Sequence, residues 1–135
     1  MGRLRIYDDE GKLQNFDPSG NMSVTDNDAQ HNTLSVAEIV GGIIVHTSVT
    51  GAGNVTTDTA AHIIEGYNGV GALKDIGDTI TCYYINDGGA YALTIVGGTN
   101  VTVADDGQTI TQNESAVLLF RRTAATTVTV YVIGA

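Results

Sequence analysis

Apolar and polar residues alternate through most of the second half of the chain, and this alternation is typical of half-buried β-strands. Turn-forming residues separate the alternating segments at positions 87–89, 97–98, 105–107 and 112–114. About six short strands divided by such turns predict an all-β sandwich or barrel. The residues that this pattern turns toward a core are Ile80, Cys82, Tyr84, Leu93, Ile95, Val101, Val103, Ile110, Val128, Val130 and Val132.

One of these strands is ambiguous, because both of its faces are apolar. Residues 115–122 turn inward either Ala116, Leu118 and Phe120 or the alternate set Val117, Leu119 and Arg121. No helical pattern is long enough for the crossovers of a parallel α/β sheet. We therefore expect an antiparallel β-sandwich, jelly-roll-like in outline, with one or two short helices.

A capping signature marks a short helix near residue 34. Ser35 and Glu38 have the spacing of a capping box, and the glycine pair at 41–42 ends the helical turn. The next segment, residues 43–49, alternates as a strand. It places His46 on the face opposite to Ile43, Val45, Thr47 and Val49.

The glycine-rich segment "GAGNVTTDT" at residues 51–59 has two possible interpretations. A phosphate-binding loop requires a lysine after its glycines, and a dinucleotide fingerprint requires a third spaced glycine; the segment has neither. The remaining interpretation is a turn followed by a short helix that Thr57 or Asp58 caps and Gly66 ends. The helix residues expected to face the core are Ala60, Ile63 and Ile64.

The first 33 residues differ from the rest of the chain. Apolar residues alternate on both sides of an acidic turn at residues 8–11, which predicts a small hairpin. Residues 17–33 are polar and are interpreted as a linker or extended arm. We therefore divide the chain into an N-terminal arm, residues 1–33, and a β-sandwich domain, residues 34–135. An arm with so few apolar residues cannot offset its own ordering entropy, so we expect it to order against the surface of a partner or of a neighbouring subunit.

Composition and charge exclude several classes of function. Apolar residues make up 42% and charged residues 16% of the chain, which suits a folded domain with a core. The net charge of −9 argues against nucleic acid and against an anionic membrane surface, since both attract Lys and Arg. No membrane-length apolar run and no signal-peptide core is present, so we expect no membrane partner and no export. Cys82, the single cysteine, is expected to be a buried thiol.

The order of these segments resembles a β-domain found in virion proteins of tailed bacteriophages. The resemblance rests on "VGGIIV" after a capped turn, then "TTDTAAHII", "GDTITCYYIND", "LTIVGGTNVTV", "ITQNESAVLLFRRT" and a terminal "VTVYVIG". It covers residues 34–135 and does not extend to the first 33 residues. Where the family has a basic residue and a proline after "GGII", this chain has "VHTSVTG", so no role of those two residues is carried over.

The resemblance implies a virion structural protein rather than an enzyme. The family includes capsid decoration (cement) proteins and head-fibre domains, and decoration proteins of this kind are typically trimers on the capsid lattice. We therefore expect a homotrimer, made in the host cytoplasm, that binds the capsid exterior, contacts the major capsid protein and stabilises the shell. The alternative is a host-attachment or carbohydrate-binding domain of a phage head or tail fibre.

Candidate chemistry in the sequence is sparse, and we expect no catalytic residue, cofactor or metal. His31, His46 and His62 have no ligand spacing and are interpreted as ordinary surface or interface residues. The acids at 8–10 and 105–106 lie in glycine-containing turns, where solvated carboxylates are common. The more specific alternatives are a pair of catalytic carboxylates, as in glycosidases, or a calcium-binding loop at Asp105 and Asp106.

Aromatic and basic residues are the remaining candidates for binding. Tyr83, Tyr84 and Tyr91 fit cross-strand packing or an interface better than a sugar site. Two basic pairs on an acidic chain are candidates to meet carboxylates on a partner. Together with the apolar residues of the arm, the expected partner-binding residues are Arg3, Leu4, Arg5, Ile6, Phe16, Arg121 and Arg122.

Overall fold

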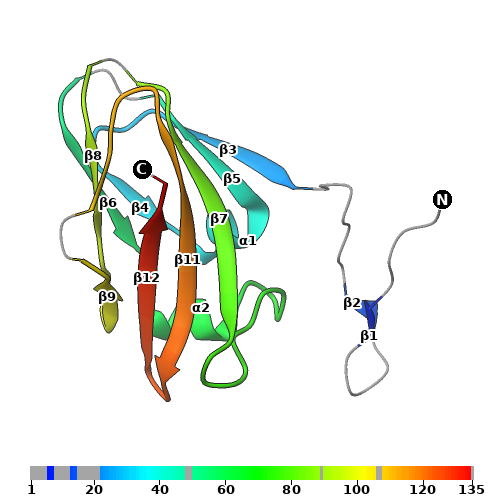
Figure 1. The fold of residues 1–135 in the computed structure, drawn as a ribbon. Coiled ribbons are helices and arrows are strands. Elements are labelled where there is room, and N and C mark those ends of the chain that lie inside the picture. The colour runs from blue at the N-terminus through cyan, green and yellow to red at the C-terminus, as the bar shows by residue number, and fades with distance from the viewer. Residues whose placement is uncertain are drawn as a thin grey trace.

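Two β-sheets, of six and four strands, pack face to face and form most of the structure (Figure 1). The computed structural model describes residues 22–47, 50–88, 90–105 and 108–134, together with the backbone of the strands at Ile6–Tyr7 and Leu13–Gln14. The strands are β1 (Ile6–Tyr7), β2 (Leu13–Gln14), β3 (Ser23–Asn27), β4 (Asn32–Leu34), β5 (Gly42–His46), β6 (Gly53–Thr57), β7 (Thr79–Asn86), β8 (Leu93–Val96), β9 (Val101–Val103), β10 (Thr109–Ile110), β11 (Ser115–Ala124) and β12 (Thr127–Ile133). The helices are α1 (Val36–Gly41) and α2 (Ala60–Glu65).

From β3 to β11 the chain changes sheet at every strand. The six-stranded sheet has the order β3-β5-β7-β11-β12-β9, and the four-stranded sheet has the order β10-β8-β6-β4. Strands β3, β5 and β7 are therefore parallel neighbours, as are β4, β6 and β8, and β9 is parallel to β12. The antiparallel pairs of the two sheets are β7–β11, β11–β12 and β8–β10.

The expectation of an antiparallel sandwich is therefore wrong for the parallel pairs, and the sheets are mixed. That expectation assumed that a parallel pair needs a helix for its crossover. In this chain the crossover between two parallel strands of one sheet is made largely by a strand of the other sheet. The coarser expectation, an all-β fold with two short helices, is confirmed.

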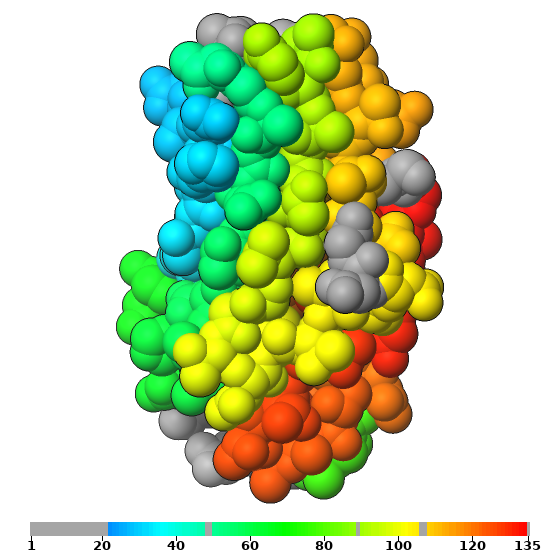
Figure 2. Space-filling view, turned by 90° about the vertical axis from the view of Figure 1, so that its left-hand side faces the viewer, coloured from blue at the N-terminus to red at the C-terminus, as the bar shows by residue number. Residues whose placement is uncertain are grey.

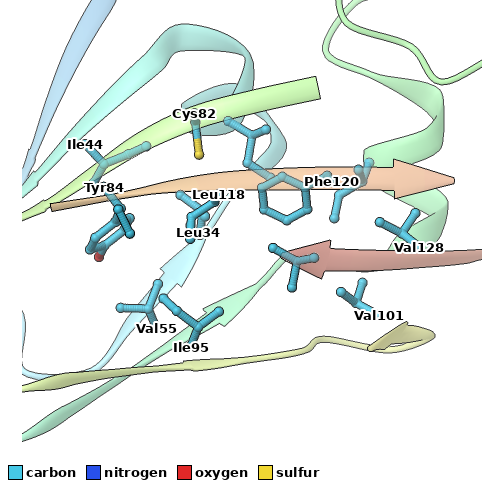
Figure 3. Packing of buried hydrophobic residues seen from close by; sticks show 14 of the residues in the cluster. Leu34, Ile44, Val55, Cys82, Tyr84, Ile95, Val101, Leu118, Phe120 and Val128 are labelled. Atoms are coloured by element: carbon cyan, nitrogen blue, oxygen red, sulfur yellow. The ribbon is translucent and has the colours of Figure 1, made fainter. Parts of the chain in front are cut away.

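The core lies between the sheets and contains the residues that the alternation turned inward (Figure 3). Cys82, Tyr84, Leu93, Ile95 and Val128 are among those buried as expected. The structure also resolves the ambiguous strand β11 in favour of its even-numbered residues. The buried set there is Ala116, Leu118 and Phe120.

Both helices have the expected position, but one cap differs. The side chain of Ser35 accepts from the backbone of Glu38, whose own side chain accepts from the Ser35 backbone, so the capping box is confirmed. Helix α2 begins one residue later than expected, because Thr59, rather than Thr57 or Asp58, is its N-cap. Thr57 is buried at the end of β6, a strand that the sequence hid because Val55 is its one large apolar residue.

The N-terminal part of the chain is only partly a linker. The expected hairpin is confirmed in the backbone of β1 and β2, which pair with each other and with neither large sheet. The linker interpretation is wrong for residues 23–27 and 32–33, which form β3 and most of β4. Both strands lie at a sheet edge, where polar side chains such as those of β3 remain solvated.

Candidate interaction site: a braced loop and an apolar sheet face

Arg122 fixes the connection between α2 and β7, which we call the α2–β7 loop and define as residues 66–78. Its guanidinium Nη1 donates to the carbonyl oxygens of Leu73 at 3.0 Å and Lys74 at 2.7 Å. Its Nη2 and Nε donate to the carbonyl oxygens of Ala125 at 2.8 Å and Ala124 at 3.4 Å. The side chain therefore ties the loop to the turn between β11 and β12.

The backbone adds a second set of ties at the same place. Arg122 N donates to the Asp78 carbonyl at 3.0 Å, and Gly77 N donates to the Arg122 carbonyl at 2.7 Å. The Asp78 carboxylate accepts from Asp75 N at 2.9 Å and closes the turn between them. Leu73 anchors the middle of the loop in the core, where it is 1% exposed. The loop is thus held by hydrogen bonds and by packing.

This fixed loop exposes large apolar side chains. Tyr67 is 50% exposed, Val70 44% and Ile76 62%. Tyr67 and Val70 exchange backbone hydrogen bonds of 3.0 and 2.9 Å across a tight turn. Because the backbone is already ordered, a partner that covers these side chains orders little else on this protein, and such preorganisation favours binding.

Arg121 and Arg122 are neighbours in sequence but face different surroundings. Arg121 is exposed on the outer face of the six-stranded sheet, beside Gly77 of the α2–β7 loop. Within the described part of the chain its side chain forms no ion pair or hydrogen bond, whereas Arg122 uses its donors on backbone carbonyls. Of this basic pair, Arg121 is the residue with donors free for a partner carboxylate.

The same outer face carries a continuous apolar row. The register places Val24, Ile43, Tyr83, Val117 and Ile133 side by side across five neighbouring strands. Val24 is 62% exposed, Tyr83 47% and Ile133 50%. Proteins seldom expose an apolar row of this length, so the face is a candidate interaction surface.

The outer face of the four-stranded sheet is the opposite case. Its two rows are Thr109–Thr94–Asn54 and Val96–Thr56–Thr33, so it is predominantly polar. Figure 2 looks onto this side of the molecule, where β4 is blue, β6 blue-green and β8 yellow-green. Because this outer face is polar, the overall composition of the chain does not explain the apolar row on the six-stranded sheet.

His46 is buried in the core, so its interpretation as a surface or interface residue is wrong. Its Nδ1 lies 2.7 Å from the hydroxyl of Tyr84, and Asn32 Nδ2 donates to the same hydroxyl at 3.4 Å. The Tyr84 proton is then available to Nδ1, which suits a neutral imidazole. Burial lowers the pKa of His46 and raises the pKa of Tyr84. The sequence misled because Ile44 and His46 share the buried face of β5, whereas Ile43 and Val45 face outward.

The other two histidines have separate structural partners. His62 Nδ1 lies 2.7 Å from Asp58 Oδ1, and Asn54 N donates to His31 Nδ1 at 3.1 Å. Burial raises the pKa of Asp58, but the hydrogen bonds from His62 and from backbone amides outweigh burial and lower it overall. Among the described residues no three His, Cys, Asp or Glu side chains gather as metal ligands.

The remaining sequence candidates do not converge on one site. Tyr84 lies in the core, Tyr83 on the outer sheet face and Tyr91 in the connection before β8. Asp105 is exposed. The side chains of Arg3, Leu4, Arg5, Ile6, Phe16, Asp8, Asp9, Glu10 and Asp106 lie outside the described residues.

Sequence reasoning missed the apolar loop and the apolar sheet face. The ambiguity of β11 was the available signal for the sheet face, since two apolar faces on one strand indicate a possible packing surface on each side. No comparable signal marked the loop, because Arg122 and Leu73 are far apart in sequence.

No helix in the described ranges is long and apolar enough to span a membrane. Comparison with protein-family models, curated proteins and solved structures finds no match for the chain.

Proposed function

We propose that the chain is a virion structural protein, a capsid decoration protein that binds the capsid exterior as a homotrimer and contacts the major capsid protein. The observation that supports binding as its mode of action is the α2–β7 loop, which exposes Tyr67, Val70 and Ile76 on a backbone fixed by Arg122. The identity of the partner rests on the sequence resemblance over residues 34–135. In this proposal the sandwich is a jelly-roll-like domain with mixed sheets.

Such a protein acts through binding alone. A folded protein that bridges neighbouring capsid subunits adds its own contacts to those that must break when the subunits separate. Because it binds the assembled lattice better than separated subunits, it stabilises the shell by mass action. The exposed donors of Arg121 beside the loop suit a carboxylate on the capsid surface.

The test is co-sedimentation of the purified protein with capsids of the parent phage, with its mass measured by light scattering. We expect a trimeric mass and saturable binding. Tyr67→Ser is expected to weaken binding about tenfold, a loss of about 1.4 kcal/mol, because an interface tyrosine is a frequent hot spot. Tyr91→Ser is the matched control, since Tyr91 is 39% exposed and lies off the loop.

Three outcomes contradict parts of this proposal. Equal binding by both variants and the unsubstituted protein shows that the loop is not the contact. A monomeric mass at micromolar concentration contradicts the trimer. Binding to glycans without binding to capsids replaces the proposal by the host-attachment or carbohydrate-binding alternative.

A further inference from the structure

The apolar row of the six-stranded sheet lacks a covering layer in the described part of the chain. The row begins at Val24 on the edge strand β3 and ends at Ile133 on β12. Val45 and Ile85 extend it on one side, and Leu119 and Tyr131 extend it on the other. All of these positions are half-buried or exposed, in contrast to the inner positions of the same strands.

The N-terminal segment joins the sheet at the end of this row. Residue 22 leads directly into β3, and Val24 is the second residue of that strand. Phe16 precedes Ser23 by seven residues, which span up to about 23 Å when extended. The row crosses five strands, which is about 19 Å at the usual strand spacing of about 4.8 Å. The row lies within this extended length, and Tyr83, two strands or about 10 Å from Val24, stays within reach of Phe16 when the connection includes a turn.

The sequence before β3 is suited to a chain reversal. Asp17, Pro18 and Gly20 occupy the first, second and fourth positions of a four-residue segment, and these are their preferred positions in a type I turn. Such a turn would direct the preceding residues back toward the sheet. The short tether also gives the segment a high effective concentration at its own sheet, which favours an intramolecular contact over one between copies.

Within the described residues, the hairpin and the apolar sheet face each lack a packing partner, and each offers apolar surface to the other. An isolated two-stranded hairpin such as β1–β2 is marginal in water and needs a surface to pack against. Its chain carries alternating apolar residues and the cations Arg3, Arg5 and Lys12. The same segment also carries Asp8, Asp9 and Glu10, which balance these cations, so burial of apolar surface rather than net charge favours the contact.

We propose that the outer face of the six-stranded sheet binds the chain's own N-terminal segment, residues 1–16, with Leu4, Ile6 and Phe16 as its apolar anchors. The contact covers the row from Val24 to Ile133 and completes the sandwich with a third layer. It is independent of the proposed capsid contact, which uses the α2–β7 loop.

The first experiment uses Phe16→Trp in the full chain, which contains no other tryptophan. We expect blue-shifted emission and protection from acrylamide. The double substitution Tyr83→Asp with Val117→Asp should abolish both. The matched control, Asn54→Asp with Thr94→Asp, places the same charges on the polar face of the four-stranded sheet and should leave both unchanged. Circular dichroism checks that each variant is folded.

The second experiment keeps the proposal testable if the double variant unfolds. Phe16→Cys with Tyr83→Cys should oxidise to a disulfide within one chain, which migrates as a monomer on a non-reducing gel. A disulfide-linked oligomer would show instead that the segment covers a neighbouring copy, and it would overturn the proposal. Solvent-like emission of Phe16→Trp that becomes protected only on capsids would also overturn it, and would assign the segment to the capsid.

Discussion

The two sheets of the sandwich expose opposite kinds of surface. The four-stranded sheet is apolar mainly on its inner face, and its outer face carries chiefly threonine and asparagine. The six-stranded sheet is apolar on both faces, with Leu118 inside and Val117 outside on the same strand. The alternation of residue types along a strand therefore divides its side chains between two faces, but it does not show which face is exposed to solvent. A second apolar face indicates a second packing partner.

The largest expected effect is a difference in the free energy of unfolding between substitutions on the inner face and on the outer face of β11. Leu118→Ala should lower the free energy of unfolding by about 2–5 kcal/mol, because it opens a cavity beside Phe120 in the core. Leu119→Ala, one residue along on the outer face, should lower it by clearly less, because the half-buried side chain leaves no enclosed core cavity. Urea denaturation of both variants measures the difference. Equal losses would mean that the outer face is as fully packed as the core.

The inner face of β5 should make stability depend on pH through His46. Its pKa is lowered in the folded state, so between that value and about 6.5 the unfolded chain binds a proton that the folded protein does not. Stability should therefore be complete above about pH 6.5 and fall as the pH decreases, by up to about 1.4 kcal/mol per pH unit.

The control for this pH dependence is His46→Gln, which keeps an acceptor for the Tyr84 hydroxyl but does not titrate. Unfolding free energies at pH 7.5 and 5.5 should differ less in this variant than in the unsubstituted protein. Asp58 does not contribute to the change in unfolding free energy between pH 7.5 and 5.5. Its pKa is lowered, so its contribution is lost only as the pH falls through a value below its ordinary 3.8.

Two adjacent residues of β7 should differ in thiol reactivity. Cys82 is fully buried, and burial raises its pKa to about 12, so its native-state reaction with a thiol reagent should be slow. In a Tyr83→Cys variant the new thiol on the outer face should react faster than Cys82. Labelling followed by mass spectrometry measures both rates. Rapid labelling of Cys82 without denaturant would contradict the strand register.

The smallest effect is expected on the polar outer face of the four-stranded sheet. Thr56→Val keeps the shape of a half-buried side chain whose neighbours in register are Thr33 and Val96. Its free energy of unfolding should stay within about 0.5 kcal/mol of the unsubstituted protein. Thermal melting checks this, and a loss well above that range would show that this face is also packed against a partner.

The sequence predicted the parts of the fold whose signal is local. The capping box at Ser35, the end of α2 at Gly66 and the inward residues of β7 and β12 follow from neighbouring residues, and the structure confirms them. The strands β3, β4 and β6 were missed because each has only one large apolar residue. Their pairing partners, which the local sequence does not contain, fix them as strands.

The candidate site was less predictable for the same physical reason. Arg121 and Arg122 were identified as a pair from their charge on an acidic chain. Which of them keeps free donors depends on carbonyl oxygens at Leu73 and Lys74, about fifty positions away in sequence. The exposed residues of the α2–β7 loop had no periodic pattern to mark them. Their importance follows from the bracing contacts and not from their local sequence.

The way in which the chain changes sheet at successive strands has a consequence for folding kinetics. Among the strands of the two large sheets, β11 and β12 are the one pair of consecutive strands that lie side by side. Every other pairing closes a longer loop, so the described sandwich has a high share of non-local contacts and should fold slowly for its size. A ribosome must also release the last strands before the centre of the six-stranded sheet can form. The C-terminal hairpin is therefore the natural nucleus, and folding of this domain is expected to follow its synthesis rather than accompany it.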